Sequence, residues 1–393
     1  MNITFLLRLW PVYGGGETVT ICLANEMIKR GWNVSVLYFK NNTRTDLPFI
    51  DPAVKAVQIP DIRCDEFTTR FPDADKVTSY LKEYIQENDI HYLINQWWPV
   101  EYIRGIRGRY KTKIVTCLHQ ALYTPMIEGT GINGFLKKRC TSLYKFWKKR
   151  HSCRQVTRFL PHTDKYIFLS PAFQHQYEQF ANHKNTNRQL GAIPNPLVYP
   201  NEIRPEDLQS KEKTVLLVGR MVEIQKRITR AIKIWSAIEN DPRLDEWNFR
   251  IVGEGPDLAM YKQLAQTLGL KRISFEGFRN PQPYYKQAAI FMMTSAFEGF
   301  PMTLVEAQQC GVVPVVMDSY LSLHDIVETG YNGIIVSNED LTGYVNKIKE
   351  LMTDTSLREK LAMNGLHSCR RFCVEEIVNN WEELFNDLSA NRR

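Results

Sequence analysis

Two glutamates eight residues apart, Glu298 and Glu306, stand on either side of a Gly–Phe–Pro bend in the segment SAFEGFPMTLVEAQQCG (295–311). Pro301 suits the first turn of a helix, where its missing N–H would have had no partner, and Gly311 suits the end of that helix. Carboxylates accept hydrogen bonds from sugar or ribose hydroxyls, and the N–H groups of a helix start attract phosphate. If the pair were only structural, Glu306 would be an exposed helix residue and Glu298 a charge favoured by the helix dipole.

Two cations and a run of glycines are the next groups with possible chemistry. Arg220 and Lys226 lie six residues apart in VGRMVEIQKRI (218–228), near an expected helix start. They suit a diphosphate, whose negative charge grows when it departs as a leaving group, although solvated surface cations are the plain alternative. The run YGGGET (13–18) opens a helix and allows a close backbone approach to an anion, or forms only a tight turn.

The segment between Glu128 and Asp164 is basic and contains no acidic residue. Lysines and arginines alternate there with leucines and aromatic residues, a pattern typical of an amphipathic helix on an anionic membrane surface. Each cation close to such a surface contributes about 1 kcal/mol, so several together would hold a protein there reversibly. A solvated helix face and a basic cleft for phosphate groups are the alternatives; nucleic acid is not expected, because no recognised nucleic-acid module surrounds the segment. The expected membrane or acceptor contacts are Lys137, Lys138, Trp147, Lys148, Lys149 and Arg150.

Length and composition limit the class of protein. A chain of 393 residues with 44% hydrophobic and 24% charged residues predicts a globular protein of two domains. No apolar run reaches 18 residues, so no transmembrane helix is expected. The eight cysteines lack paired spacing, which is typical of reduced thiols in a cytosolic protein and predicts no metal site. We therefore expect a cytoplasmic protein, with peripheral attachment to the inner face of the membrane.

Short apolar runs alternate with helical patterns along the whole chain. Runs that are apolar on both faces predict parallel sheets covered by helices, that is, an α/β fold. The series restarts after a stretch rich in proline and charge, which predicts two α/β domains whose ligands collect beyond the carboxyl ends of the strands. The expected strands are 3–7, 34–39, 91–95, 113–118 and 165–170, then 214–219, 249–253, 273–277, 290–295, 312–317 and 332–337. The expected domains are 1–192, a linker at 193–212, a second domain at 213–372, and a final helix at 373–393 that packs back on the first domain.

Taken in order, these motifs resemble the retaining glycosyltransferases of family 4. The resemblance rests on GGGET, IPNPL at the domain junction, VGR with its lysine, GEGP, and EGFPMTLVEAQQCGVVPVV, which matches the E-x7-E motif of that family. It implies the GT-B fold, with two Rossmann-like doubly wound domains facing a cleft and a C-terminal helix crossing back to the first. It also implies transfer of a sugar from a nucleotide diphosphate sugar with retention of configuration and without a cofactor or metal.

The resemblance also implies roles for individual residues. Arg220 and Lys226 would neutralise the diphosphate, Glu306 would bind the ribose hydroxyls, and Glu298 would contact the donor sugar. His119 matches the histidine that family members place by the reacting sugar. Further donor contacts would come from Gly15, Gly16, Phe278, Arg279, Gly299, Phe300, Met302, Thr303 and Leu304. Two departures are Gln120, where members often have aspartate, and Arg227, where glycine is common.

The expected activity follows from these roles. The donor would be a UDP-sugar in the first place and GDP-mannose in the second, and the acceptor a glycan or lipid-linked saccharide of a cell-surface polysaccharide. The departing diphosphate would itself take the acceptor proton, so that Arg220, Lys226, Glu298 and His119 form the catalytic set. The alternatives are a sugar-nucleotide epimerase on the same architecture and a non-catalytic, membrane-associated partner of another transferase.

Overall fold

The fold is described from a computed structural model. The structure describes residues 1–11, 15–41, 49–60, 62, 73–123, 141–184, 188–199 and 203–390. The chain divides into two compact units, which are described separately. The first unit combines Met1–Pro196 with Val374–Arg393, and the second is Leu197–Cys373.

The first unit is built on a parallel sheet of seven strands in the order β5-β3-β1-β6-β7-β8-β9. Each neighbouring pair is parallel, as the runs of buried apolar residues predict. The strands are β1 (Asn2–Leu6), β3 (Asn33–Tyr38), β5 (Lys55–Gln58), β6 (Tyr92–Asn95), β7 (Lys113–Leu118), β8 (Lys165–Phe168) and β9 (Leu190–Ala192). A separate pair joins β2 (Leu9–Trp10) to β4 (Lys40–Asn41).

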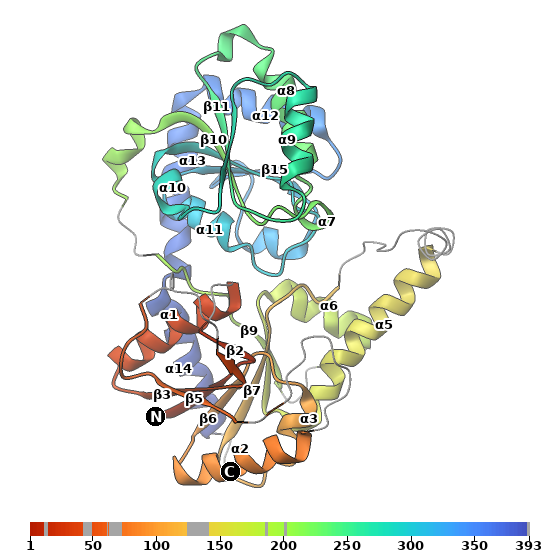
Figure 1. The fold of residues 1–393 in the computed structure, drawn as a ribbon, viewed down its shortest axis with the longest axis vertical. Helices are drawn as coiled ribbons and strands as arrows, with labels where there is room; N and C mark the ends of the chain where they lie inside the picture. The colour runs from red at the N-terminus through yellow and green to blue at the C-terminus, as the bar shows by residue number, and fades with distance from the viewer. Residues whose placement is uncertain are drawn as a thin grey trace. The chain divides into compact units, whose positions relative to one another are not determined.

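Helices cover both faces of this sheet. Successive side chains of a strand point to opposite faces of the sheet. On one face, Leu93 of β6 belongs to the core under α2 (Ala74–Glu87) and α3 (Val100–Ile103). On the other face, the Tyr92 ring stacks on Phe385, with 4.1 Å between ring centroids. Phe385 lies on α14 (Val374–Ala390), and Figure 1 shows α14 in blue beside α1 (Gly15–Lys29) in red. The other helices are α5 (Thr141–Phe159), the short 3₁₀ turn η1 (Leu160–His162) and α6 (Pro171–Ala181).

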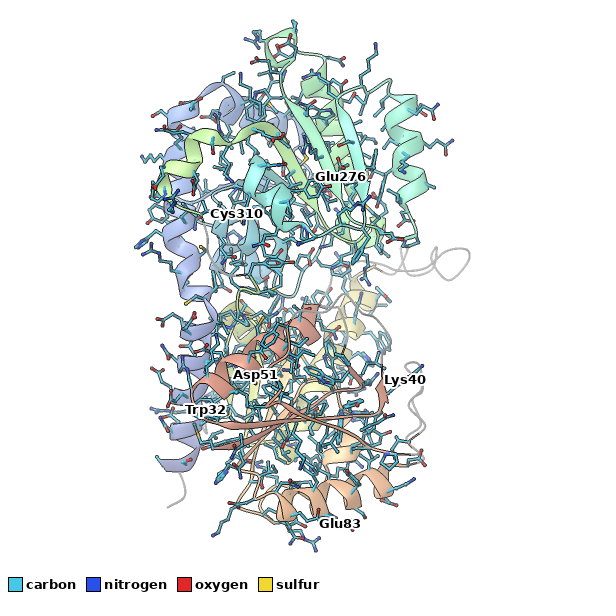
Figure 2. The ribbon with its side chains drawn as sticks, turned by 60° about the vertical axis from the view of Figure 1, so that its left-hand side comes forward. Trp32, Lys40, Asp51, Glu83, Glu276 and Cys310 are labelled. Carbon is cyan, nitrogen blue, oxygen red and sulfur yellow. The ribbon has the colours of Figure 1, made fainter. Side chains whose placement is uncertain are left out.

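Polar contacts fasten α14 to the first unit as well. Arg30, just after α1, donates to the side chains of Asn379 at 2.8 Å and Glu382 at 3.2 Å. The Tyr92 hydroxyl donates to the Phe385 carbonyl at 2.9 Å. Trp32 packs edge-on against the Phe385 ring, with 6.0 Å between centroids, and Figure 2 shows it beside this helix. The last helix of the chain is therefore part of the core of the first unit.

The second unit has a parallel sheet of six strands in the order β12-β11-β10-β13-β14-β15. Its strands are β10 (Glu212–Val218), β11 (Asn248–Val252), β12 (Ile273–Gly277), β13 (Ala288–Met293), β14 (Val313–Asp318) and β15 (Ile334–Ser337). Its helices are α7 (Glu223–Lys226), α8 (Ile228–Glu239), α9 (Leu258–Thr267), α10 (Gln282–Gln287), α11 (Met302–Gln309), α12 (Leu341–Thr353) and α13 (Thr355–Ser368).

One core joins the sheet of the second unit to its helices. Trp235 of α8 packs on Phe249 of β11, with 5.5 Å between ring centroids, and both are fully buried. The 3₁₀ turn η2 (Pro205–Ser210), inside the range expected as a linker, contributes Leu208 to this core. Leu208 lies so close to Gly311 that a Cβ there would come within 2.3 Å of it. Part of that range therefore packs into the second unit.

The α/β architecture predicted from the sequence is confirmed. Each of the expected strands is present, with ends displaced by no more than two residues. The sequence patterns did not predict β2, β4, β5 and β9, which are too short to show a clear apolar run. Among the helices of the described residues, none combines the length and apolar character needed to cross a bilayer.

Candidate functional site

The expected diphosphate cations and Glu298 follow two neighbouring strands of the second unit. Strand β10 has β11 on one side and β13 on the other, so the connections leave it in opposite directions and the topology switches between β10 and β13. In open α/β sheets, ligands bind at such a switch, beyond the carboxyl ends of the strands. Arg220 and Lys226 follow β10, and Glu298 follows β13. The strand order therefore brings together residues that are far apart in the sequence.

Lys226 and Glu298 form a buried ion pair. The Nζ atom of Lys226 lies 2.7 Å from Oε1 of Glu298, and their side chains are 14% and 8% exposed. Gln225 donates to the other carboxylate oxygen at 3.2 Å, and its backbone carbonyl accepts from Ala296 at 2.7 Å. A lysine ammonium has three donors, so the bond to Glu298 orients it and leaves capacity for a second partner.

Arg220 is the more exposed of the two cations. Its guanidinium donates to the side-chain oxygen of Gln225 at 3.4 Å. Gln225 thus connects Arg220 to Glu298 through its amide. Sequence reading did not select this glutamine, although it lies next to Lys226, because a lone amide carries no recognisable pattern.

The bend before α11 has the predicted form. Pro301 directly precedes the helix, Cys310 follows it, and Gly311 has a φ of +66°, the left-handed conformation common after helix ends. The Phe300 ring is buried against Phe372, with 5.3 Å between centroids, so Phe300 anchors the bend and can offer a ligand only its backbone. The first-turn N–H groups, including those of Met302 and Thr303, have no acceptor inside the helix. They are available to an anion.

Glu306 lies inside α11 and is buried rather than exposed. It is 8% exposed, and the hydroxyl of the fully buried Tyr285 donates to Oε2 at 3.0 Å. Burial raises the pKa of the Glu306 carboxyl to about 7, and the bond from Tyr285 opposes part of that rise. The structural alternative, in which Glu306 is an ordinary exposed helix residue, is wrong. Holding a carboxylate here costs stability, which is typical of a binding or catalytic position.

Glycines allow the ends of two strands, β10 and β11, to meet closely beside this site. Gly253 has a φ of +141°, and a Cβ there would come within 2.0 Å of the Gly219 carbonyl oxygen. A Cβ on Gly255 would come within 2.6 Å of the Met221 carbonyl oxygen. The GEG sequence after β11 is therefore required by backbone packing against the segment that carries Arg220.

Phe278 and Arg279, the expected base contacts, follow β12 and are both exposed. The Phe278 side chain is 45% exposed. Glu276, labelled in Figure 2, precedes them and accepts from the Ser274 hydroxyl at 2.6 Å. These side chains are at the edge strand of the sheet, two strands from β10.

The first unit carries the remaining expected site residues. Helix α1 begins at Gly15, and Gly16 lies in its first turn. His119 follows β7, and its ring lies 5.3 Å from that of Trp97, centroid to centroid, at an angle of 31°. Both ring nitrogens of His119 are buried and have no hydrogen-bond partner among the described residues. This desolvation lowers the pKa of His119 to about 4, so the imidazole is neutral at pH 7.

Helix α5 carries the basic segment, and Figure 1 shows it in yellow extending away from the sheet of the first unit. Leu143, Phe146 and Trp147 are 71%, 64% and 58% exposed, an unusual state for three large apolar side chains on one helix. Arg150 is exposed too, whereas Lys149 is half-buried, with its ammonium 4.4 Å from the centre of the Phe180 ring. Lys137 and Lys138 lie outside the described residues.

The structure therefore places Arg220, Lys226, Glu298 and α11 around one topological switch, and His119 in the other unit. Sequence reading missed Gln225 and Tyr285, which donate to the two glutamates, and Trp97, whose ring packs at an angle against that of His119. A usable signal for Trp97 existed, because QWW (96–98) directly follows an expected strand in the same way as His119.

Three known proteins illustrate the similarity of this chain to others. It is 22% identical over 99% of both chains to the GalNAc-alpha-(1->4)-GalNAc-alpha-(1->3)-diNAcBac-PP-undecaprenol alpha-1,4-N-acetyl-D-galactosaminyltransferase of Campylobacter jejuni. It is 28% identical to an exopolysaccharide phosphotransferase of Streptomyces coelicolor over 52% of this chain, and spans about one fifth (21%) of that relative. The crystal structure of HepE from Anabaena in complex with UDP superposes with a TM-score of 0.70 at 18% identity, covering 98% of this chain and 100% of that one.

Family models match both halves of the chain. A model described as Glycosyltransferase Family 4 matches residues 13–196, and one described as Glycosyl transferases group 1 matches residues 199–367. Nearly the whole chain is therefore covered by two models that belong to one kind of enzyme, with glycosyltransferases among the similar folds. The chain belongs to the family 4 (group 1) glycosyltransferases and has their two-domain GT-B fold.

Proposed function

We propose that this enzyme transfers a sugar, with retention of anomeric configuration, from a nucleoside diphosphate sugar to a glycan or lipid-linked saccharide. The second unit would hold the donor and the first would receive the acceptor. The observation that carries the proposal is the switch between β10 and β13, where Lys226, Arg220 and the start of α11 offer positive charge beside two buried glutamates. That combination suits a diphosphate flanked by hydroxyl-bearing rings.

The cations supply the main catalytic effect in this proposal. As the bond from the sugar to the diphosphate breaks, negative charge develops on the leaving oxygens, and Lys226, Arg220 and the N–H groups of Met302 and Thr303 stabilise it. Their orientation is fixed beforehand, since Glu298 and Gln225 hold Lys226 and Arg220. Glu306 binds the ribose hydroxyls, and Phe278 and Arg279 meet the base. No metal or other cofactor is required for the step.

The engagement of the glutamates supports retention. Glu298 is held by Lys226 and Gln225, and Glu306 by Tyr285, so neither carboxylate is positioned as an independent base. The leaving diphosphate oxygen then takes the proton of the acceptor hydroxyl on the face that it leaves. His119, neutral at pH 7, hydrogen-bonds the reacting sugar without adding charge.

The relatives support particular substrates. HepE was crystallised with UDP, which favours a UDP-sugar as donor, with GDP-mannose as the second choice. The Campylobacter relative is named for an acceptor on undecaprenol diphosphate, which favours a lipid-linked saccharide in cell-envelope synthesis. We therefore place the enzyme in the cytoplasm, with peripheral contact to the inner face of the membrane.

Nucleotide release from a panel of nucleotide sugars tests the donor. We expect release with at least one UDP-sugar, unaffected by a chelator such as EDTA, and a product whose anomeric configuration by NMR equals that of the donor. Release from none of the panel would contradict the donor assignment, and an inverted product would contradict retention. The double variant Lys233→Gln and Lys262→Gln, which removes two exposed cations elsewhere in the second unit, should keep normal turnover.

Vesicle binding tests the membrane contact through α5. The exposed stripe of Leu143, Phe146 and Trp147 stands among exposed cations, which matches an anionic bilayer surface. At low salt, we expect binding to phosphatidylglycerol vesicles but not to phosphatidylcholine vesicles. The variant Lys145→Gln, Arg150→Gln, Arg154→Gln should lose most of this binding. Equal loss in a charge-matched control, Lys233→Gln, Lys262→Gln, Lys360→Gln, would reduce the effect to net charge and contradict a specific surface.

A further inference from the structure

Lys211 is a cation of the second unit that the proposed reaction does not use. It lies between the 3₁₀ turn η2 and strand β10. Its ammonium donates to three backbone carbonyls, those of Tyr285 at 3.0 Å, Lys286 at 2.7 Å and Cys310 at 2.6 Å. A lysine ammonium has three N–H donors, so these three carbonyls occupy all of them.

The three carbonyls lie at the ends of two helices. Tyr285 and Lys286 belong to the last turn of α10, and Cys310, labelled in Figure 2, directly follows α11. The last carbonyls of a helix have no partner inside the helix, and the helix dipole makes that end negative, so a cation is favoured there. Helix α10 precedes strand β13 and α11 follows it. Lys211 therefore joins two helices that a strand separates in the sequence.

The same two helices carry the hydrogen bond from Tyr285 to Glu306. The Tyr285 hydroxyl donates to the Glu306 carboxylate, while the Tyr285 backbone carbonyl accepts from Lys211. On the other side, the N–H of Cys310 donates to the Glu306 backbone carbonyl at 3.1 Å, while the Cys310 carbonyl accepts from Lys211. These hydrogen bonds form a closed cycle, in which Glu306 lies opposite Lys211.

The chain that enters the second unit also holds the end of α11 at two further points. The side-chain amide of Gln309 donates to the Tyr199 carbonyl at 2.7 Å, and Leu208 packs against Gly311. Lys211 extends this attachment to α10. The entering segment thus fixes the end of the helix that carries Glu306, and Lys211 fixes the helix that carries its hydrogen-bond donor.

A comparison with Lys213 shows that the position of Lys211 lowers the stability of its charged form. Lys213, two residues later, is 52% exposed and forms an ion pair with Glu246 at the surface. Lys211 has no carboxylate in an ion pair with it among the described residues, and burial lowers its pKa to about 8. A charge kept at such a cost is typical of a functional position.

A carboxylate that binds ribose hydroxyls has to be held to within about 0.5 Å of its binding position by the residues around it. We propose that Lys211 is the positioning residue for Glu306: by joining the ends of α10 and α11, it holds Tyr285 on the carboxylate in the orientation that binds the donor ribose. Its effect is on recognition of the ribose and not on the diphosphate, which Lys226 and Arg220 meet. The inference rests on the proposed function, which assigns Glu306 to the ribose.

Binding of nucleotides with and without the ribose 2′-hydroxyl tests this inference. The probes are UDP and 2′-deoxy-UDP, with GDP and 2′-deoxy-GDP in parallel, measured by titration calorimetry on the full chain at pH 7. In the wild type, we expect one of the ribonucleotides to bind about tenfold more tightly than its deoxy form. Lys211→Met should reduce this ratio to about threefold or less, with the affinity for the deoxy form within about twofold of the wild type.

Three results would overturn the inference. They are a wild type that binds no ribonucleotide more tightly than its deoxy form, a ratio that Lys211→Met leaves unchanged, and an equal loss of affinity for both forms. The last result would mean that Lys211 only stabilises the fold. If Lys211→Met does not fold, Lys211→Arg gives the same test, because a planar guanidinium cannot reproduce the three bonds of one ammonium. It should lower the ratio as well, and an unchanged ratio would again overturn the inference.

Two further variants show where Lys211 acts. Lys213→Met, the matched control, removes a lysine charge from the exposed surface and should keep the wild-type ratio; an equal fall in the ratio would contradict a specific role of Lys211. Glu306→Gln should lower the ratio by itself, and adding Lys211→Met should lower it no further, because both changes act on one contact. A further fall in the double variant would contradict action through Glu306.

Release of nucleotide by the wild type from the panel of nucleotide sugars tests the proposed function by itself. Release together with a ratio that does not depend on Lys211 would refute the positioning role and leave the transferase assignment intact. A ratio that depends on Lys211, in a protein that releases no nucleotide, would leave the positioning role intact and refute the transferase assignment.

Discussion

The topological switches of the two sheets resemble each other in strand order but differ in how their polar groups are satisfied. In the second unit, Lys226 and Glu298 neutralise each other at 2.7 Å, and Tyr285 donates to Glu306. In the first unit, the nitrogens of Trp97 and His119 are buried without partners among the described residues. The buried carboxylates at one switch have partners within the chain, while buried ring nitrogens at the other have none among the described residues.

The two units therefore differ in which buried polar groups lower the stability of the fold. A buried ion pair needs both members, because either charge left alone in a low dielectric is strongly unfavourable. A buried neutral donor without a partner costs about 1–3 kcal/mol and can be removed with a gain in stability. Removing one partner of the ion pair should therefore destabilise the second unit, and removing an unpartnered buried nitrogen should stabilise the first; the following variants test that contrast.

The largest effect is expected for Lys226→Met. The substitution leaves the 8% exposed Glu298 carboxylate without its cation, which should lower the free energy of unfolding by about 3–5 kcal/mol. Donor turnover should fall about 100–1,000-fold, because a preorganised charge for the diphosphate is lost. Denaturant unfolding and nucleotide release measure the two effects. The double variant Lys226→Met, Glu298→Gln should recover much of the stability and none of the turnover; unchanged stability in the single variant would show that the pair is not buried in solution.

Glu306→Gln should stabilise the protein at high pH. The pKa of Glu306 is about 7 in the folded chain, above its ordinary value of 4.5, so its stabilising contribution is full below pH 4.5 and is lost as the pH rises through 7. Glutamine stays neutral and can still accept from Tyr285, so at pH 8 the variant should exceed the wild type by about 1–3 kcal/mol while its donor KM rises. Chemical denaturation at pH 5 and pH 8 measures the difference. Equal stability at pH 8 would contradict the raised pKa.

His119→Leu should give the opposite pH dependence in the first unit. The pKa of His119 is lowered from 6.5 to about 4, so its contribution is full above pH 6.5 and is lost as the pH falls through 4. Leucine removes both unpaired nitrogens and should raise the free energy of unfolding by about 1 kcal/mol at pH 7, and by more at pH 5. The same chemical denaturation series, extended to pH 7, measures this change in the free energy of unfolding. A loss of stability at pH 7 would show that the histidine is hydrogen-bonded in the folded chain, and the contrast between the two units would fail.

The smallest effect is expected for Arg227→Gly. Arg227 has a φ of +49°, a conformation that glycine adopts without strain, and this accounts for the glycine common at this place in the family. This gain in stability is offset by the greater conformational entropy of the unfolded chain and by the loss of a surface ion pair to Glu339 at 3.3 Å. We expect a change in unfolding free energy within about 1 kcal/mol and normal turnover. A large loss of turnover would show instead that Arg227 acts on the donor together with Lys226.

Prediction from the sequence succeeded where the signal was local. The strands from 3–7 to 332–337 were found because continuous apolar runs mark buried parallel strands. Strand β5, Lys55–Gln58, escaped because its residues are mostly exposed at an edge of the sheet, and β9, Leu190–Ala192, because three residues carry too little pattern. The bend before α11 was found from Gly299 and Pro301, whose backbone preferences do not depend on distant residues.

The sequence by itself determined the α/β class, the order of the strands along the chain and the candidate residues at their ends, because these depend on neighbours in the chain. Only the tertiary structure decided that Lys226 meets Glu298, 72 residues away, and that Tyr285 meets Glu306 inside the protein. The same holds for Trp97, whose N–H is left unpaired while that of Trp98 is satisfied. The physical reason is that pairing and burial are set by which strands become neighbours in space, and β10 lies next to β13 although two other strands separate them in sequence.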